Sequence, residues 1–173
     1  MYDPTIFDNL KVVFENEVYD LDNVDRKITI TNRKDVMDFA ILAREFAIQF
    51  TLEDQKDITA EIVLTASLND LAGEILEQTE EGLGCSLVLR FIKSIQNVER
   101  CKEIEQALKG IWEDGINLTQ TLGFNYGEEM ESYSNHIELR FKRKINEAHM
   151  HEIDDFLKHV LLSLEVLHRI GIE

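Results

Sequence analysis

Two similar stretches of the chain indicate its architecture: LVLRFIKSIQN (Leu87–Asn97) and IELRFKRKIN (Ile137–Asn146). Both contain the pattern Leu-Arg-Phe-x-Lys/Arg-x-Ile. Each is followed by a second related segment, EIEQALK (Glu103–Lys109) and EIDDFLK (Glu152–Lys158). The first segment of each pair alternates apolar and polar residues, which predicts a strand, and the second carries apolar residues at helical spacing. We therefore expect two related strand–helix repeats.

Other alternating or β-branched segments predict further strands. Lys27–Thr31 is rich in β-branched residues and reads as a strand. Phe46–Leu52 and Ile58–Ala66 alternate on either side of the polar turn Asp54–Asp57, which predicts a hairpin with one buried face. Ile116–Leu122 alternates in the same way and is expected to add one more strand.

The N-terminal region gives weaker signals. We expect residues 1–9 to form a cap or short turn, and Lys11–Phe14 and Glu17–Leu21 to form a hairpin around a polar turn. Asn32 is placed to cap a short helix over Arg33–Ala43. The apolar residues of that stretch also suit a strand, and the sequence leaves both alternatives open.

Ser67 and Asp70 have the spacing of a capping box, so we expect a helix to begin there, with Leu68, Leu71, Ala72 and Ile75 as its apolar stripe. Glu81–Gly84 would end that helix, since glycines commonly follow helix C-termini. This segment is the best candidate boundary between two pseudo-halves, residues 1–82 and 83–173.

The longest helix is expected at Glu147–Arg169, where apolar residues recur at spacings of three and four. Hairpin strands together with one-sided helices predict a single α+β domain over residues 1–173. Its antiparallel or mixed sheet would carry helices packed on one face and would be built partly from the two strand–helix repeats. The other face would be polar, and either solvated or a dimer or partner surface.

Composition narrows the class of protein. The chain has 44% hydrophobic residues, too many for a disordered chain, and a formal charge of −16 that opposes binding to nucleic-acid phosphates. No apolar run approaches the roughly 20 residues that span a bilayer. The N-terminus lacks the basic and apolar blocks of a signal peptide, and two cysteines make no disulfide framework. We expect a cytoplasmic protein with reduced thiols, no membrane contact and no nucleic-acid partner.

Arg90 and Arg140 occupy matching positions in the two repeats. Paired guanidinium groups suit a carboxylate or phosphate, so these residues are the candidates for binding an anionic ligand. The alternative is that the arginines form ion pairs with Glu61 or Glu138. Arg140 also belongs to the basic run Arg140–Lys144, which in so acidic a chain is expected to balance neighbouring carboxylates and to protect a strand edge.

His151, Asp155 and His159 lie four residues apart, which places them on one helix face, and these residue types bind metals. The set lacks a further ligand, so we expect solvated side chains and no metal site. The chain contains no nucleophile elbow, glycine-rich phosphate loop, His-Glu-x-x-His or Cys-x-x-Cys motif. No catalytic residue and no cofactor are predicted.

The segment Gly123–Asn135 combines aromatic and acidic residues on one long predicted loop. Aromatic side chains anchor many interfaces, so it is the best candidate for contacting a partner. Its proposed partner-binding residues are Phe124, Tyr126, Glu128, Glu129, Glu131 and Tyr133.

We therefore expect a non-enzymatic protein–protein interaction module that self-associates or binds a basic protein. An immunity- or antitoxin-type inhibitor of a basic toxin or nuclease is one specific form, because acidic charge speeds the capture of a cationic target. The alternative is a domain or enzyme that binds a small anionic molecule, either between the repeat halves or on the polar sheet face.

Overall fold

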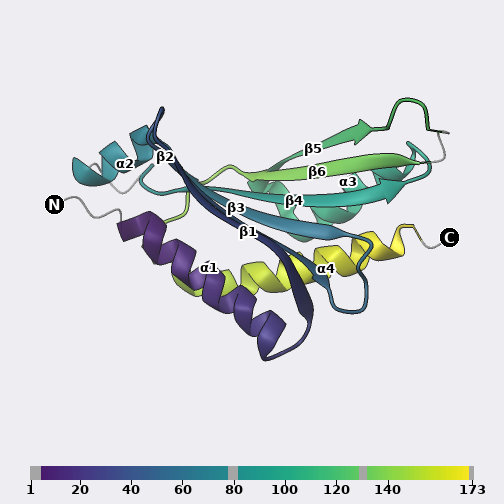
Figure 1. Cartoon of the computed structure of the whole chain (residues 1–173), viewed down its shortest axis with the longest axis horizontal. Coiled ribbons are helices and arrows are strands. Elements are labelled where there is room, and N and C mark those ends of the chain that lie inside the picture. Colours follow the sequence, from purple (N-terminus) through teal and green to yellow (C-terminus); the bar gives the residue numbers. More distant parts are fainter. Residues whose placement is uncertain (1–4, 78–81, 129–131, 172–173) are drawn as a thin grey trace.

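The computed structural model describes residues 5–77, 82–128 and 132–171, and within these ranges six strands form one antiparallel sheet. The strands are β1 (Ile28–Asp38), β2 (Ala43–Leu52), β3 (Thr59–Ala66), β4 (Ser86–Ile95), β5 (Ile116–Gly123) and β6 (Tyr133–Phe141). Their spatial order is β1-β2-β3-β4-β6-β5. The helices are α1 (Thr5–Asn23), α2 (Leu68–Ile75), α3 (Arg100–Trp112) and α4 (Ile153–Arg169), and the short 3-10 segments are Glu113–Gly115 and Glu147–Glu152. Figure 1 shows the arrangement, and it confirms the α+β class.

The N-terminal hairpin predicted for residues 11–21 is wrong, because α1 occupies this region as one continuous helix. Phe7, Leu10, Phe14 and Val18 recur at spacings of three and four and are all buried. That spacing forms a helical stripe, and burial of the whole stripe against the sheet outweighs the local β preference of the valines.

The short helix predicted for Arg33–Ala43 is also wrong. Strand β1 continues through this region to Asp38, and the chain then turns into β2, with Asp38 paired opposite Ala43. A β-bulge between Ile30 and Asn32 shifts the register on the way. The apolar residues of the turn have no surface to pack against, so a helix here would gain nothing from burial, whereas pairing with β2 satisfies the strand backbone.

The capping box at the start of α2 is confirmed. The Asp70 amide donates to Ser67 Oγ over 3.2 Å, and the Ser67 amide donates to an Asp70 carboxylate oxygen over 2.9 Å. Of the predicted apolar stripe, Leu71 is buried, but Leu68 and Ile75 are exposed. This short helix therefore presents part of its apolar surface to solvent.

Two boundaries near the C-terminus differ from the predictions. The irregular segment expected to reach Asn135 is shorter, because β6 already begins at Tyr133. The last helix begins at Ile153 rather than at Glu147, since the 3-10 turn Glu147–Glu152 precedes it. Asn146 fixes that turn by accepting the Ala148 amide over 2.9 Å.

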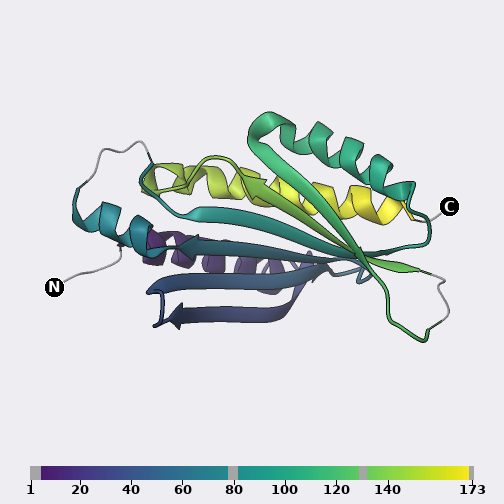
Figure 2. The ribbon, with the colours of Figure 1, turned by 90° about the horizontal axis from the view of Figure 1, so that it is seen from above.

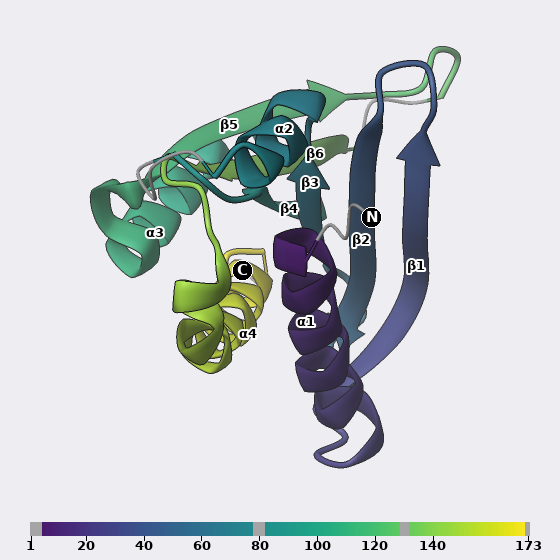
Figure 3. The same cartoon turned by 90° about the vertical axis from the view of Figure 1, so that its left-hand side faces the viewer.

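The core lies between the sheet and helices α1, α3 and α4, which all cover the same face (Figure 3). Both repeat copies fold as a strand followed by a helix, β4 with α3 and β6 with α4. The two strands are neighbours in the sheet, and α3 lies beside α4 (Figure 2). The structure does not confirm that the copies are related, and the repeat stays a prediction. No described helix has both the length and the apolar character needed to cross a bilayer.

Candidate functional site

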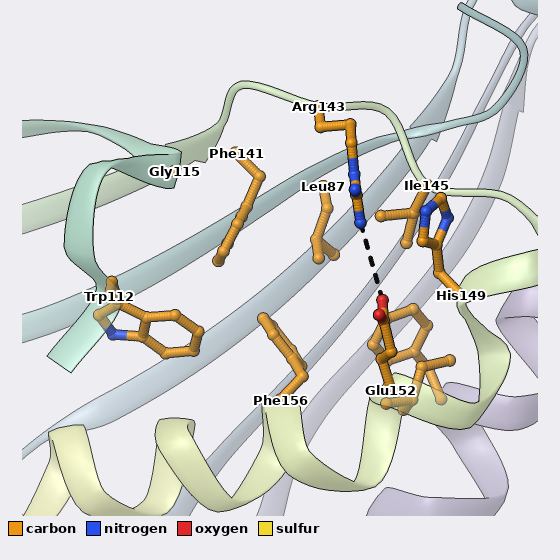
Figure 4. A pocket seen from close by; sticks show the side chains of 11 residues that line it. Leu87, Trp112, Gly115, Phe141, Arg143, Ile145, His149, Glu152 and Phe156 are labelled. Carbon is orange, nitrogen blue, oxygen red and sulfur yellow. Dashed lines mark ion pairs between the residues drawn. The ribbon is translucent and has the colours of Figure 1, made fainter. Parts of the chain in front are cut away.

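A cavity of about 450 Å³ opens between the two strand–helix units, on the helix-covered side of the sheet (Figure 4). Residues from five regions of the sequence meet there. The lining consists of Phe14, Leu87, Trp112, Gly115, Phe141, Arg143, Ile145, His149, Glu152, Ile153 and Phe156. The cavity thus lies between the predicted repeat halves, where the sequence allowed for a small-molecule site.

Three aromatic rings form one wall of this pocket. The ring centroid of Trp112 lies 5.4 Å from that of Phe141 and 5.5 Å from that of Phe156, and the two phenylalanine rings are 5.6 Å apart. The indole N–H donates to Ser163 Oγ over 3.0 Å, so its polar atom is satisfied. Figure 4 shows the carbon ring of Trp112 on the side of Phe156. The wall therefore offers hydrocarbon surface and aromatic edges to an apolar group.

The mouth of the pocket is polar. Arg143 and Glu152 form an ion pair of 3.8 Å across it, drawn dashed in Figure 4. Both side chains are mostly exposed, so the pair is weak and the guanidinium can reorient toward another anion. The Asn146 amide donates to His149 Nδ1 over 3.0 Å, which leaves Nε2 of the neutral ring as an N–H donor. The geometry suits an apolar group that carries an anionic end.

Arg90 and Arg140, the candidates for anion binding, lie together on the open face of the sheet, and both are already paired. Arg90 donates to Glu61 over 3.0 Å and to Glu138 over 3.2 Å, and Arg140 Nε lies 2.6 Å from the other Glu138 oxygen. Burial lowers the pKa of Arg90, but these two carboxylates outweigh it and raise that pKa. An anionic ligand would have to displace the carboxylates, so the geometry favours the ion-paired alternative.

The acidic-aromatic loop after β5 is placed only in part. Phe124 is exposed, and Tyr126 is fully exposed at 101% of its reference area. Asn125 Nδ2 donates to Glu128 over 3.3 Å. Tyr133 instead begins β6 and packs against the core. The other two predicted partner-binding residues, Glu129 and Glu131, lie outside the described residues.

The three weak metal candidates on α4 do not converge on one point. His159 Nδ1 lies 2.7 Å from the backbone oxygen of Asp155, and its ring packs against Trp112 with 5.5 Å between centroids. The Asp155 carboxylate pairs with Lys158 over 3.7 Å, and His151 is exposed. In residues 5–77, 82–128 and 132–171, no group of three or more His, Cys, Asp or Glu side chains could hold a metal ion.

The turn between β1 and β2 is a functional candidate that sequence reasoning missed. The run VMDFAIL (Val36–Leu42) covers the end of β1 and this turn; every large apolar side chain in it is exposed, and Phe39 reaches 80%. The carboxylate of Asp38 accepts the Ala40 amide over 2.9 Å and so fixes the turn. Leu42 has φ +53°, a conformation that favours glycine. A large apolar residue therefore occupies a strained, exposed position where a small one would fit better.

Comparisons of the chain with protein-family models, curated proteins and solved structures give no match.

Proposed function

We propose that this protein is a non-enzymatic, cytoplasmic protein-binding module that contacts a basic partner protein through the apolar β1–β2 turn. The observation that carries the proposal is the exposure of Phe39, Ile41 and Leu42. These residues belong to the β1–β2 turn, which lies at the same end of the molecule as α2 (Figure 1). Exposed apolar clusters of this kind mark interaction sites on soluble domains. Ala66, at the end of β3, pairs with Arg44, which lies just after the β1–β2 turn. The exposed Leu68 of α2 comes two residues after Ala66 and therefore lies close to the same turn.

The charges around the turn favour a basic partner. The cationic side chains near it are already paired with carboxylates of the chain: Lys34 with Glu45, Arg44 with Asp8 and Asp35, and Lys144 with Asp70. Asp38 lies within the turn, and only the Ala40 amide donates to its carboxylate in the described chain. With a formal charge of −16 overall, the surface would steer a cationic partner toward the turn.

A crosslinking experiment tests this proposal. A photoreactive phenylalanine analogue placed at position 39 should crosslink one basic protein in host lysate at low salt, with less product as salt rises. The double substitution Phe39→Ser and Ile41→Ser, with the analogue moved to position 36, should abolish the product. Leu162→Ser, which alters an exposed leucine on α4, is the matched control and should leave it unchanged.

Equal crosslinking by the double variant and by the Leu162→Ser control would refute the proposal. A product containing only two copies of this chain would assign the turn to self-association instead. An immunity- or antitoxin-type inhibitor is the specific form of the proposal if the captured protein is a basic toxin or nuclease. In that case the purified module should suppress the activity of the captured protein.

A second candidate function, binding of a small amphipathic anion, is favoured by the aromatic pocket. A cavity of about 450 Å³ with three aromatic rings and Arg143 at its mouth has the size and lining of a small-molecule site. Trp112 is the single tryptophan of the chain and lines the cavity, so its fluorescence reports on occupancy. Saturable quenching by anilinonaphthalene sulfonate, which has an apolar body and an anionic end, would support this function. Unchanged fluorescence would count against it.

A further inference from the structure

Lys93 is buried without a charge partner near the end of β4. Its side chain lies on the helix-covered face of the sheet, opposite Asn135 of β6, and the residue is only 5% exposed. The ammonium group lies beneath the end of α4, where a Cβ added to Gly171 would come within 2.9 Å of Nζ. Within the described chain, no hydrogen bond or ion pair reaches the Lys93 ammonium group.

A cavity of about 330 Å³ adjoins this amine. It is lined by Asp57, Lys93, Ser94, Ile95, Gln96, Arg100, Ser132, His168, Ile170 and Gly171. The one carboxylate among them, Asp57, is engaged by His168 Nδ1 at 2.8 and 3.0 Å. Arg100 lines the cavity while it also contacts Glu103 over 3.0 Å. The cavity thus combines two cations with a single carboxylate that is held by a histidine, within a strongly acidic chain.

An ammonium group in this position is energetically unfavourable unless something compensates it. Burial lowers the pKa of Lys93, Asp57 opposes that shift, and Arg100 adds to it. The cross-strand neighbour of Lys93 also has an unmet polar atom, because Oδ1 of Asn135 is buried and accepts no hydrogen bond from the described chain. Buried polar groups are rarely left unsatisfied, so two such groups on neighbouring strands at this end of the core are a reason to look for a ligand there.

We propose that this cavity binds a small oxyanion, either a phosphate or a carboxylate, held by the Lys93 ammonium and the Arg100 guanidinium. A bound oxyanion would accept hydrogen bonds from the N–H groups of the Lys93 ammonium. Its negative charge would also compensate the buried positive charge at this end of β4. Ser94 and Ser132 also line this cavity. This site is separate from the apolar turn and from the aromatic pocket, and it does not depend on either.

The test measures the melting temperature of the full chain in phosphate, acetate or chloride at equal ionic strength. Saturable stabilisation by phosphate alone would assign the site to phosphate, and stabilisation by acetate as well would assign it to carboxylates. Lys93→Met should weaken the binding at least roughly tenfold, because the methionine keeps the volume but removes the charge. Arg100→Gln should weaken it by a smaller factor. Lys102→Met removes one exposed charge from the same helix and should bind like the original chain.

Folding of the Lys93→Met variant is checked by circular dichroism, and we expect it to be at least as stable as the original chain without the anion, since a buried unpaired charge is lost. A stabilising response retained by Lys93→Met would overturn the proposal. So would the absence of any response to phosphate or acetate in the original chain. A strongly destabilised Lys93→Met variant would show that the ammonium has a partner within the fold, and this too would overturn it.

Discussion

Substitution of Gly84 tests whether the close approach of two backbone segments, the one that leads into β4 and the one that contains Ile145, stabilises the fold. Its φ is +141°, and a Cβ added there would collide with the carbonyl oxygen of Ile145 and lie 2.8 Å from its carbonyl carbon. The backbones of Cys85 and Ile145 pair through two hydrogen bonds of 2.8 and 3.0 Å at this point. Gly84→Ala should therefore separate the two segments. Because Ile145 lines the aromatic pocket, the substitution should also disturb that site.

The expected loss of stability has two parts. An L residue held at this φ is strained by about 1–3 kcal/mol. Loss of the two backbone hydrogen bonds adds about 0.5–1.5 kcal/mol each, so the free energy of unfolding should fall by about 2–6 kcal/mol in total. Gly82→Ala is the matched control, because Gly82 also has a positive φ of +95° but a Cβ there meets no atom within 4 Å. It should lose only the strain, about 1–3 kcal/mol.

Urea unfolding followed by far-ultraviolet circular dichroism measures both variants. The decisive quantity is the difference between them, expected at about 1–3 kcal/mol with Gly84→Ala the less stable. Equal losses in the two variants would show that Ile145 moves aside freely. The close approach of the two backbones would then contribute nothing to the fold.

Three further outcomes are expected. Burial raises the pKa of Cys85 to about 12, so this thiol should resist alkylation by iodoacetamide at pH 8 until urea unfolds the chain. The free energy of unfolding should fall as the pH rises from 9.0 to about 12, because only the thiol of the unfolded chain ionises in that range. Arg143→Gln should weaken quenching of the tryptophan by anilinonaphthalene sulfonate, whereas Lys142→Gln should not, in a fluorescence titration. Burial opposes ionisation of Asp35, but the hydrogen bonds and positive charges of Lys11 and Arg44 together outweigh it and lower the pKa of Asp35 below 3.8. Asp35→Asn should therefore cost about 1–2 kcal/mol near pH 7 in urea unfolding and progressively less as the pH falls through that pKa.

Patterns that repeat along the chain predicted the central part of the fold. Alternation identified β2 to β6, and the Ser67–Asp70 capping box identified the start of α2. The same reasoning failed for α1, where the valines of Lys11–Phe14 and Glu17–Leu21 suggested strands. The helical spacing of the apolar residues was present there, but it becomes clear only over the whole of Thr5–Asn23. Short windows favour local propensity, whereas packing against the sheet selects the longer period.

The candidate sites were less predictable because they are formed by residues that lie far apart in the sequence. Leu87, Trp112 and Phe156 meet in one pocket although long stretches of chain separate them, and no local motif marks their convergence. Alternation does place Arg90 and Arg140 among the polar residues of their strands. Arg140 lies two residues from Glu138 on the same strand, but the contact of Arg90 with Glu138 depends on the pairing of β4 with β6, and sequence patterns do not give strand order. The exposed run Val36–Leu42 was missed because the sequence predicted a helix over Arg33–Ala43, with a strand as the alternative, and neither prediction placed a turn there.

The polar contacts on the open face of the sheet help to set the register of the strands. Gln49, Glu61, Arg90, Glu138 and Arg140 form a continuous chain of contacts across β2, β3, β4 and β6. A slip of β6 by one residue would turn Glu138 toward the apolar core and leave its carboxylate buried without a partner. Exposed pairs of this kind add little to total stability, but each wrong alignment would break several of them at once. The contacts on the polar face therefore favour one register of the strands. They destabilise sheets with a shifted register more than they stabilise the correct sheet.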